Sequence, residues 1–217
     1  MRIDIWSDIL CPFCYIGKRK LEMALADFEH KDAVQITWHS FQLDPSLVAQ
    51  PGKSIYQYLA ERKGQSLEWS VNAHNQLRRT AAEVGLDYHF EKTIVANSFD
   101  AHRLIHLAGR HGAADAAKEA LMRAYFTEGW NIADHNTLMQ IAIDLGLGVI
   151  ETGEMLNSDE FATNVLNDME QAERYGINGV PFFLFDLKYA ISGAQPVTMF
   201  RSALETAWNE QHKPAKV

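Results

Sequence analysis

Two cysteines three residues apart, Cys11 and Cys14, constrain the fold of this chain more than any other feature, and they are its only cysteines. They belong to the motif Cys-Pro-Phe-Cys, which follows the strand-like residues 2–8 and precedes a helical pattern. In the first turn of a helix this spacing brings the two Cα atoms to about 5.5 Å, which permits a disulfide. The partial positive charge of a helix N-terminus also favours the thiolate. The context therefore predicts a redox-active dithiol.

Two other interpretations of the cysteine pair stay open. Free cysteine is a frequent core residue, so the two thiols could be buried and inert. Structural zinc sites use four nitrogen or sulfur ligands, but the chain has neither a second cysteine pair nor a histidine within a few residues of Cys14. We therefore favour redox chemistry over an inert core and over a metal site, and we expect no bound metal.

The composition is that of an ordinary globular protein, and it narrows the range of partners. Of the 217 residues, 47% are apolar and 22% are charged, which suits one large domain or a domain with an insertion. The net charge of −8, without a long run of one sign, argues against nucleic acid and anionic membranes as partners. No signal peptide precedes the first predicted strand at Arg2, so we expect a cytoplasmic protein. In a reducing cytosol, a cysteine pair is more often catalytic or metal-binding than structural.

The beginning of the chain predicts a βαβ unit. Ile3 and Ile5 alternate with a polar residue, as in a half-buried strand, and residues 34–41 alternate in the same way. Between these two strands, the pattern predicts one helix that runs from the dithiol to near His30. Two strands joined by a crossover helix pair in parallel.

The pattern is helical from Ser54 to about Tyr175, and Asp134 is a predicted N-cap within this block. Residues 180–186 then form a short apolar run, which predicts a central strand buried on both faces. Residues 188–193 predict a partner strand, and a closing helix follows. We therefore expect half of an α/β unit in residues 1–50, a helical insertion in residues 51–175 and the second half in residues 176–217.

Pro181 stands at the start of the apolar run, where proline removes a donor from a strand. A cysteine pair after the first strand and a proline before the third, in the order βαβ, helices, ββα, resembles the thioredoxin fold. Residues 7–17, 97–104, 176–183 and 192–196 narrow this resemblance to the intracellular FrnE-like group of the DsbA oxidoreductases. The resemblance covers nearly the whole chain. It implies an α/β, thioredoxin-like fold with a large all-helical insertion.

The resemblance assigns roles around the cysteine pair. It implies that Cys11 is an exposed nucleophile, and that Cys14, one turn further on and more buried, resolves a mixed disulfide. It also implies a cis bond before Pro181 beside the dithiol, and a Val180 backbone that holds an extended substrate chain. Phe13 and its neighbour Pro12 complete the expected substrate-binding set.

Phe13 also bears on the redox chemistry. The periplasmic oxidant DsbA has histidine at this position, and a histidine stabilises the thiolate by its charge. The resemblance therefore implies a Cys11 pKa that is depressed less than in that oxidant, and a less oxidising couple.

Three further residues are candidate modulators of the site. His39 lies on the second predicted strand, near the end of the sheet where the site is expected. His102 belongs to a segment typical of the resembled group. For both histidines, ordinary packing is the favoured interpretation. Trp6 lies next to the end of the first predicted strand, and we expect it to pack near the dithiol.

Kappa-class glutathione transferases and 2-hydroxychromene-2-carboxylate isomerases resemble the chain in architecture, but they typically carry serine in place of Cys11 and lack Cys14. The two thiols thus favour an oxidoreductase acting on protein thiols and disulfides or on a small thiol. A glutathione-dependent transferase or isomerase is the alternative, and a non-catalytic peptide-binding module is the third hypothesis. We expect no bound cofactor, with glutathione as a candidate redox partner. The insertion could cap a substrate cleft or form the face of a homodimer.

Overall fold

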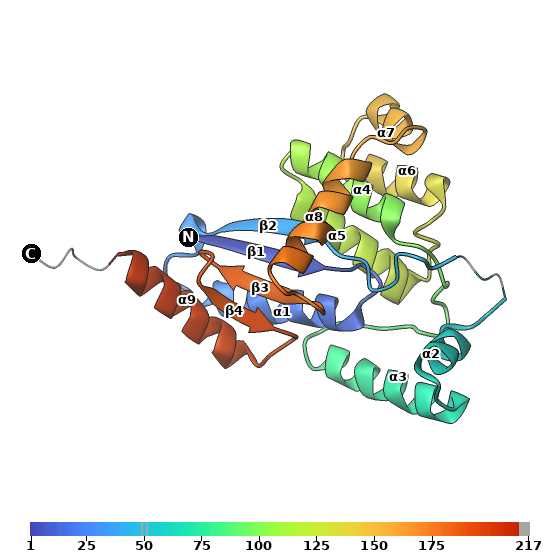
Figure 1. Ribbon diagram of the computed structural model, residues 1–217, viewed down its shortest axis with the longest axis horizontal. Helices are drawn as coiled ribbons and strands as arrows, with labels where there is room; N and C mark the ends of the chain where they lie inside the picture. The colour runs from blue at the N-terminus through green and yellow to red at the C-terminus, as the bar shows by residue number, and fades with distance from the viewer. Residues whose placement is uncertain (49, 51, 213–217) are drawn as a thin grey trace, which may run out of the picture.

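The computed structural model describes residues 1–48, 50 and 52–212, and it is built on a four-stranded sheet in the order β2-β1-β3-β4 (Figure 1). Strand β1 (Arg2–Ser7) pairs in parallel with β2 (Gln35–Ser40), as the βαβ pattern predicts. On its other side, β1 pairs antiparallel with β3 (Phe182–Phe185), which in turn pairs with β4 (Tyr189–Ser192). The two ends of the chain therefore share one sheet.

Helix α1 (Pro12–Ala26) connects β1 to β2 and packs against the closing helix α9 (Val197–Gln211). The prediction that the first helix continues to near His30 is wrong. The chain leaves the helix at Asp27, makes a turn, and then forms the short 3₁₀ helix Lys31–Ala33. Such 3₁₀ turns are common at the ends of helices, where α-helical partners run out.

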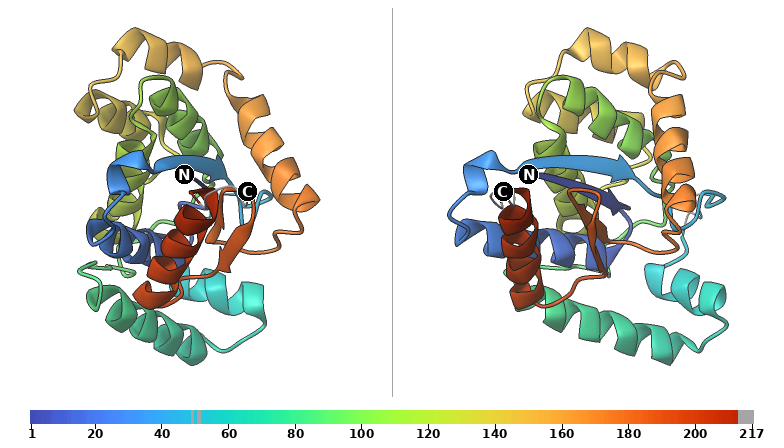
Figure 2. Two further views of the ribbon diagram at one scale, coloured as in Figure 1. Left: turned by 90° about the vertical axis from the view of Figure 1, so that its left-hand side faces the viewer. Right: turned by 60° about the vertical axis from the view of Figure 1, so that its left-hand side comes forward.

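The expected helical insertion is present, although its boundary at residue 51 lies outside the described residues. Helices α2 and α3 lie together, at the opposite end of the molecule from α6 and α7 (Figure 2). The carboxylate of Asp134 caps α6, as the sequence predicts. The helices of the insertion are α2 (Ile55–Lys63), α3 (Leu67–Ala82), α4 (Phe99–Arg110), α5 (Ala114–Arg123), α6 (His135–Asp144), α7 (Val149–Leu156) and α8 (Ala162–Arg174), with a π-helical turn at Ala124–Glu128 after α5.

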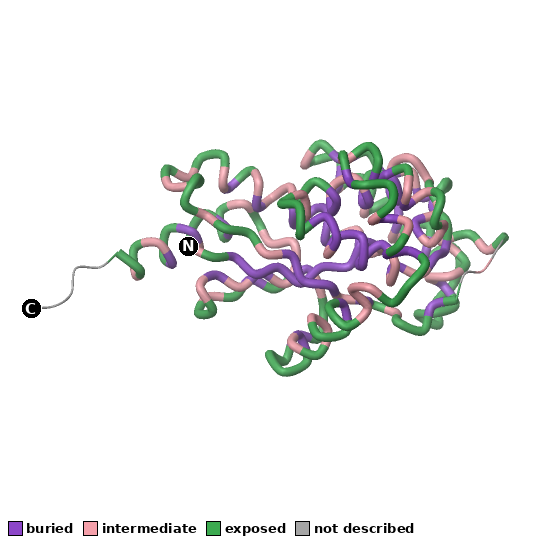
Figure 3. The backbone as a smooth tube through the Cα atoms, turned by 90° about the horizontal axis from the view of Figure 1, so that it is seen from above, coloured by how far each residue is buried: buried purple, intermediate pink, exposed green. Residues whose placement is uncertain are grey.

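The two faces of the sheet are covered unequally. Ile3 and Ile5 belong to the main core, which also contains buried residues of α1, α9 and the insertion. The buried part of the backbone runs through the sheet and into the neighbouring helices (Figure 3). The opposite face carries a small cluster around Trp6, covered by Ala172 of α8 and by Ile177. No helix in the described part of the chain has the length and apolar character to cross a bilayer.

The prediction that the apolar run is buried on both faces is therefore wrong. Within β3, Phe183 and Phe185 are fully buried, whereas Phe182 and Leu184 are only partly covered. The reason is that α8 shields part of the second face, while α1 and α9 seal the first.

This asymmetry predicts unequal effects of two neighbouring substitutions. Phe183→Ala removes a ring that packs edge-to-face on Phe200 at 4.9 Å between centroids, so it should lower the free energy of unfolding by about 3–5 kcal/mol. Leu184→Ala should cost less than half as much, since its side chain is only partly buried. Chemical denaturation of both variants measures the difference, and equal losses would contradict the unequal covering of the sheet.

Candidate active site

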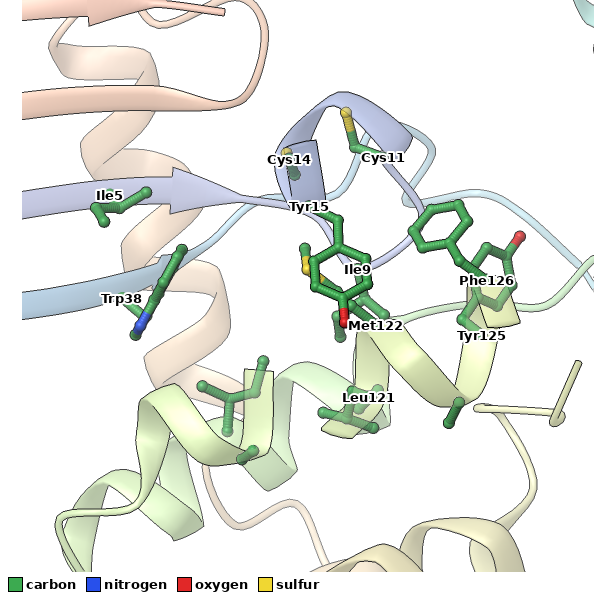
Figure 4. Close-up of a cluster of buried hydrophobic side chains, with 14 of the residues drawn as sticks. Ile5, Ile9, Cys11, Cys14, Tyr15, Trp38, Leu121, Met122, Tyr125 and Phe126 are labelled. Carbon is green, nitrogen blue, oxygen red and sulfur yellow. The ribbon is translucent and has the colours of Figure 1, made fainter. Parts of the chain in front are cut away.

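The cysteine pair lies where β1 turns into α1. Cys11 is the N-cap residue with an extended backbone (φ −91°, ψ 111°), and Pro12 opens the helix, a position where proline is favoured. The amide of Cys11 donates to the carbonyl of Asp8 at 3.3 Å, and the amide of Cys14 donates to the carbonyl of Cys11 at 3.0 Å. Figure 4 shows both sulfur atoms at this end of the helix, and both cysteines are free thiols.

The expectation that Cys11 is exposed is wrong. Cys11 is only 4% exposed and Cys14 only 1%, so the second thiol is the more buried of two buried groups. Part of the cover comes from the loop before β3, because the Cys11 thiol donates to the carbonyl of Val180 at 3.5 Å. The Val180 carbonyl therefore covers one side of the Cys11 sulfur.

The expected depression of the Cys11 pKa is also not found. The hydrogen bond with the Cys14 thiol and the burial of the pair hold the pKa of Cys11 well above its usual range, and the charge of Asp8 acts in the same direction. The amide of Cys14, at the start of the helix, opposes this rise. In the dithiol form, the Cys11 thiol therefore retains its proton at neutral pH.

The loop before β3 packs tightly against α1. The Val180–Pro181 peptide bond is cis, and the carbonyl of Pro181 accepts a hydrogen bond from Gly193 at 2.8 Å. A Cβ atom on Gly17 would lie 3.0 Å from Pro181 Cγ and 3.1 Å from Phe183 Cζ. Glycine at this position of the helix therefore permits the close approach of the proline.

An apolar cavity of about 580 Å³ opens beside the dithiol. Cys11 and Pro12 form part of its wall, and the half-exposed Phe13 also borders it. The sequence analysis left open whether the insertion caps a cleft, and it could not name the walls because, apart from Leu10, they come from segments distant in the chain. These distant walls include Leu43, Leu47, Ile55, Tyr58, Leu59, Trp69, Ala73, Leu77, Phe90, Val95, Tyr125 and Phe126.

Trp6 does not lie where the sequence analysis expected it, whereas His39 lies on β2 as predicted and is engaged in ordinary packing. Side chains alternate along a strand, so Trp6 faces away from Ile5 and from the core that contains both cysteines. Its ring stacks on His39, with centroids 4.4 Å apart. His39 in turn lies between the carboxylates of Asp4 and Asp168, at 2.7 and 2.8 Å. Although burial alone lowers it, these two hydrogen bonds raise the pKa of His39. Both residues belong to a polar network on the other face of the sheet.

His102 reaches the site through Asp8, which the sequence analysis did not single out. Its Nε2 lies 3.3 Å from Asp8 Oδ1, and both side chains are fully buried. The carboxylate of Asp8 also accepts hydrogen bonds from the amide of Leu43 at 2.8 Å and the hydroxyl of Ser98 at 2.9 Å. Burial alone raises the pKa of Asp8, but the hydrogen bond with His102 and the backbone amides of Leu43 and Leu10 lower it overall. Asp8 thus links the turn before the dithiol to the insertion through its hydrogen bonds with Ser98 and His102.

Lys118 of α5 is a second neighbour that the sequence analysis missed. Its ammonium donates to the carbonyl of Ser7 at 3.0 Å, directly below this turn. Sequence patterns treat lysine as a surface residue, so no signal marks it as buried. No group of three or more histidine, cysteine or acidic side chains that could hold a metal occurs among the described residues.

The close packing at Gly17 predicts a sharp response to one methyl group. Gly17→Ala should lower the free energy of unfolding by about 1–3 kcal/mol, because the new Cβ atom pushes on Pro181 and Phe183. Gly109→Ala, within α4, is the matched control, since its Cβ atom would meet only Ala114 at 3.7 Å and should stabilise the helix slightly. Denaturant unfolding compares the two variants. A Gly17→Ala protein as stable as the control would contradict the packing.

Comparisons with known proteins agree with this fold. The profile of the DSBA-like thioredoxin domain family matches residues 2–205. A probable DsbA oxidoreductase, SCO1869 from Streptomyces coelicolor, is 37% identical, with 100% of this chain and 93% of that chain covered and a TM-score of 0.92.

Two more distant structures share the fold. A 2-hydroxychromene-2-carboxylate isomerase is 17% identical, with a TM-score of 0.72 and 97% and 98% of the two chains covered. The cytosolic disulfide reductase DsbM from Pseudomonas aeruginosa, solved with GSH, is 18% identical, with a TM-score of 0.68 and 96% and 100% covered. The fold and family indicated by the motifs are thus confirmed: the chain belongs to the family of DSBA-like thioredoxin domains.

Proposed function

We propose that the protein is a thiol–disulfide oxidoreductase that works through Cys11 and Cys14. The observation that carries this proposal is the free cysteine pair at the start of α1, packed against the loop that contains Val180. The 37% identity to a probable DsbA oxidoreductase supports the same activity. A Cys11 side chain that served only as core would not need to border a cavity.

The proposed reaction exchanges one disulfide for another. The Cys11 thiolate attacks one sulfur of a substrate disulfide, the substrate S–S bond breaks, and the first substrate thiolate leaves. Cys14 then attacks the Cys11 sulfur of the mixed disulfide, which releases the second thiolate and forms the Cys11–Cys14 disulfide. Two electrons pass from the dithiol to the substrate, and the reverse sequence oxidises a substrate dithiol.

The electrostatics favour a reducing rather than a strongly oxidising couple. A strong oxidant of this chemistry has a stabilised reduced form with a low thiol pKa. Here the neighbouring thiol and burial raise the pKa of Cys11, and Phe13 offers no positive charge. We also propose a cytoplasmic, FrnE-like role, because a reducing couple suits a reducing compartment.

We propose a small thiol or disulfide, glutathione included, as a redox partner of the pair. DsbM, which shares the fold, has been solved with GSH, and the cavity beside Cys11 has the size of a small-molecule site. Protein disulfides are the second substrate class. An extended chain would lie along the Val180 backbone and contact Pro12 and Phe13.

The isomerase-like structure supports a glutathione-dependent isomerase or transferase as a second candidate. The two activities make opposite predictions for Cys14. Disulfide exchange requires this thiol to resolve the mixed disulfide, whereas glutathione-dependent isomerisation does not.

The test is a redox titration of the cysteine pair by thiol trapping in glutathione buffers, with insulin reduction measured in parallel. We expect a reversible two-electron couple, complete loss of insulin reduction in Cys11→Ser, and a trapped mixed disulfide in Cys14→Ser. Thiols that neither pair nor accelerate exchange would contradict the proposal. Full activity on a small molecule in Cys14→Ser would instead support the second candidate.

Phe13→Arg should make the couple more oxidising. An arginine at this half-exposed position brings a positive charge toward Cys11, and this charge persists over the whole pH range in which the thiol titrates, so it should lower the pKa of the thiol. The ultraviolet absorbance of the thiolate as a function of pH measures the pKa, and Phe13→Leu is the control that adds no charge. An unchanged Cys11 pKa in Phe13→Arg would show that charge at this position does not set the pKa of the thiol.

A further inference from the structure

A fully buried lysine lies beneath the dithiol. Lys118 is 1% exposed, although a charged lysine is rarely found in a protein interior without a partner of opposite charge. Its Nζ donates to the carbonyl of Ser7 at 3.0 Å and lies 5.6 Å from the centre of the Trp38 ring. Neither contact supplies a full negative charge. The exchange reaction described above gives this group no role.

The surroundings of Lys118 link it to the cysteine pair. Ser7 ends β1, and the next residue, Asp8, starts the turn that leads to Cys11. Negative charge on Asp8, or on either cysteine when it is a thiolate, raises the pKa of the Lys118 amine, and among these three groups the effect of Cys14 is the largest. Lys118 therefore lies where a thiolate at Cys14 would stabilise its ammonium form.

The other charged groups around Lys118 have partners of their own. Lys18 of α1 repels Lys118, but Lys18 is itself neutralised by acidic side chains. His102 of α4 also feels the charge of Lys118, while its Nε2 is engaged with Asp8. The acidic side chains that pair with Lys18 are those of Glu22, Asp115 and Glu119.

We infer that Lys118 accepts the proton of Cys14 when this thiol attacks the mixed disulfide on Cys11. This inference rests on the proposed function, and it concerns only the second step. The S–H bond of Cys14 breaks and its proton moves to the Lys118 amine. The Cys14 sulfur bonds to Cys11, the bond between Cys11 and the substrate sulfur breaks, and the substrate leaves as a thiolate. The substrate disulfide is the only oxidant that the step requires.

The charge state of Lys118 suits this role. Burial is the main cause that lowers the pKa of Lys118, to about 8, although the charges of Cys14 and Asp8 partly oppose it. Near neutral pH, roughly a tenth of such groups are free amine and can take up a proton. A surface lysine, with its usual pKa of about 10.4, would be almost entirely protonated.

Asp8 and His102 are poorer candidates for the same proton. The carboxylate of Asp8 accepts hydrogen bonds from two amides and from Ser98, and its pKa is lowered. The charges that act most on His102 are those of Asp8, Lys118 and His106. Lys118 is the buried base on which the charge of Cys14 acts.

The test follows the second step alone. Reduced wild-type protein, Lys118→Met and the surface control Lys31→Met are mixed with oxidised glutathione, quenched with acid and analysed by mass spectrometry. The mixed disulfide should form at similar rates in all three proteins. Near neutral pH, its decay should be roughly tenfold slower or more in Lys118→Met, and the difference should shrink as the pH rises, because hydroxide can then replace the amine as the base.

The outcomes separate this inference from the proposed function. If wild-type protein forms no mixed disulfide and no internal disulfide, the proposed function fails. If Lys118→Met resolves the mixed disulfide with the pH profile of wild-type protein, only the role of Lys118 is overturned. Lys118→Arg keeps the positive charge but cannot accept a proton, so full rescue by arginine would overturn proton transfer as well.

Wild-type protein decides the question if Lys118→Met does not fold. The ¹⁵N NMR signal of Lys118 Nζ reports the protonation of the amine directly. We expect it to titrate at the same pH at which the resolution rate of wild-type protein changes. An Nζ that stays an ammonium group from about pH 6 to about pH 10 would overturn the inference.

Discussion

The antiparallel pairing of β1 with β3 is the constraint on which the candidate site depends. Trp6 pairs with Phe182 near the end of β1 and the start of β3, so the turn after one strand and the loop before the other meet at one end of the sheet. This meeting brings the Cys11 thiol to 3.5 Å from the Val180 carbonyl, across 169 residues of sequence. Without this pairing, the cysteine pair would be an open turn at the start of a helix.

The helical insertion supplies the remaining surroundings of the cysteine pair. Its helices α2 and α3 form much of the cavity beside Cys11, whereas α4 and α5 supply His102 and Lys118 to the buried polar groups beneath the turn. One part of the insertion therefore lines the cavity next to the sulfur, and another places ionisable side chains beneath the turn. The buried surroundings also explain why the Cys11 pKa is raised despite the helix N-terminus.

Local patterns in the sequence were sufficient for most of the strands and helices. Alternation predicted the paired strands, and the carboxylate of Asp134 begins α6 as expected. The cysteine spacing and the position of Pro181 were equally local signals. Their meeting in space followed only from the resemblance, because no pattern within either segment encodes the pairing of β1 with β3.

The errors concern properties that depend on distant segments. The burial of Cys11 depends on the loop at Val180, which the residues around the cysteine cannot report. Trp6 was misplaced because neighbouring strand residues face opposite sides, so closeness in sequence to the dithiol did not mean closeness in space. Lys118 looked like an ordinary surface residue of an amphipathic helix, and only the packing of α5 under Ser7 shows that it is buried.

The central claim, that Cys11 and Cys14 form one redox-active unit, is tested most directly by intact-mass spectrometry of the reduced protein after brief exposure to oxidised glutathione. A redox-active pair should lose two hydrogens through a transient single-glutathione adduct, with the new disulfide mapped to Cys11 and Cys14. A stable adduct that never resolves, or a protein whose mass does not change, would contradict the account.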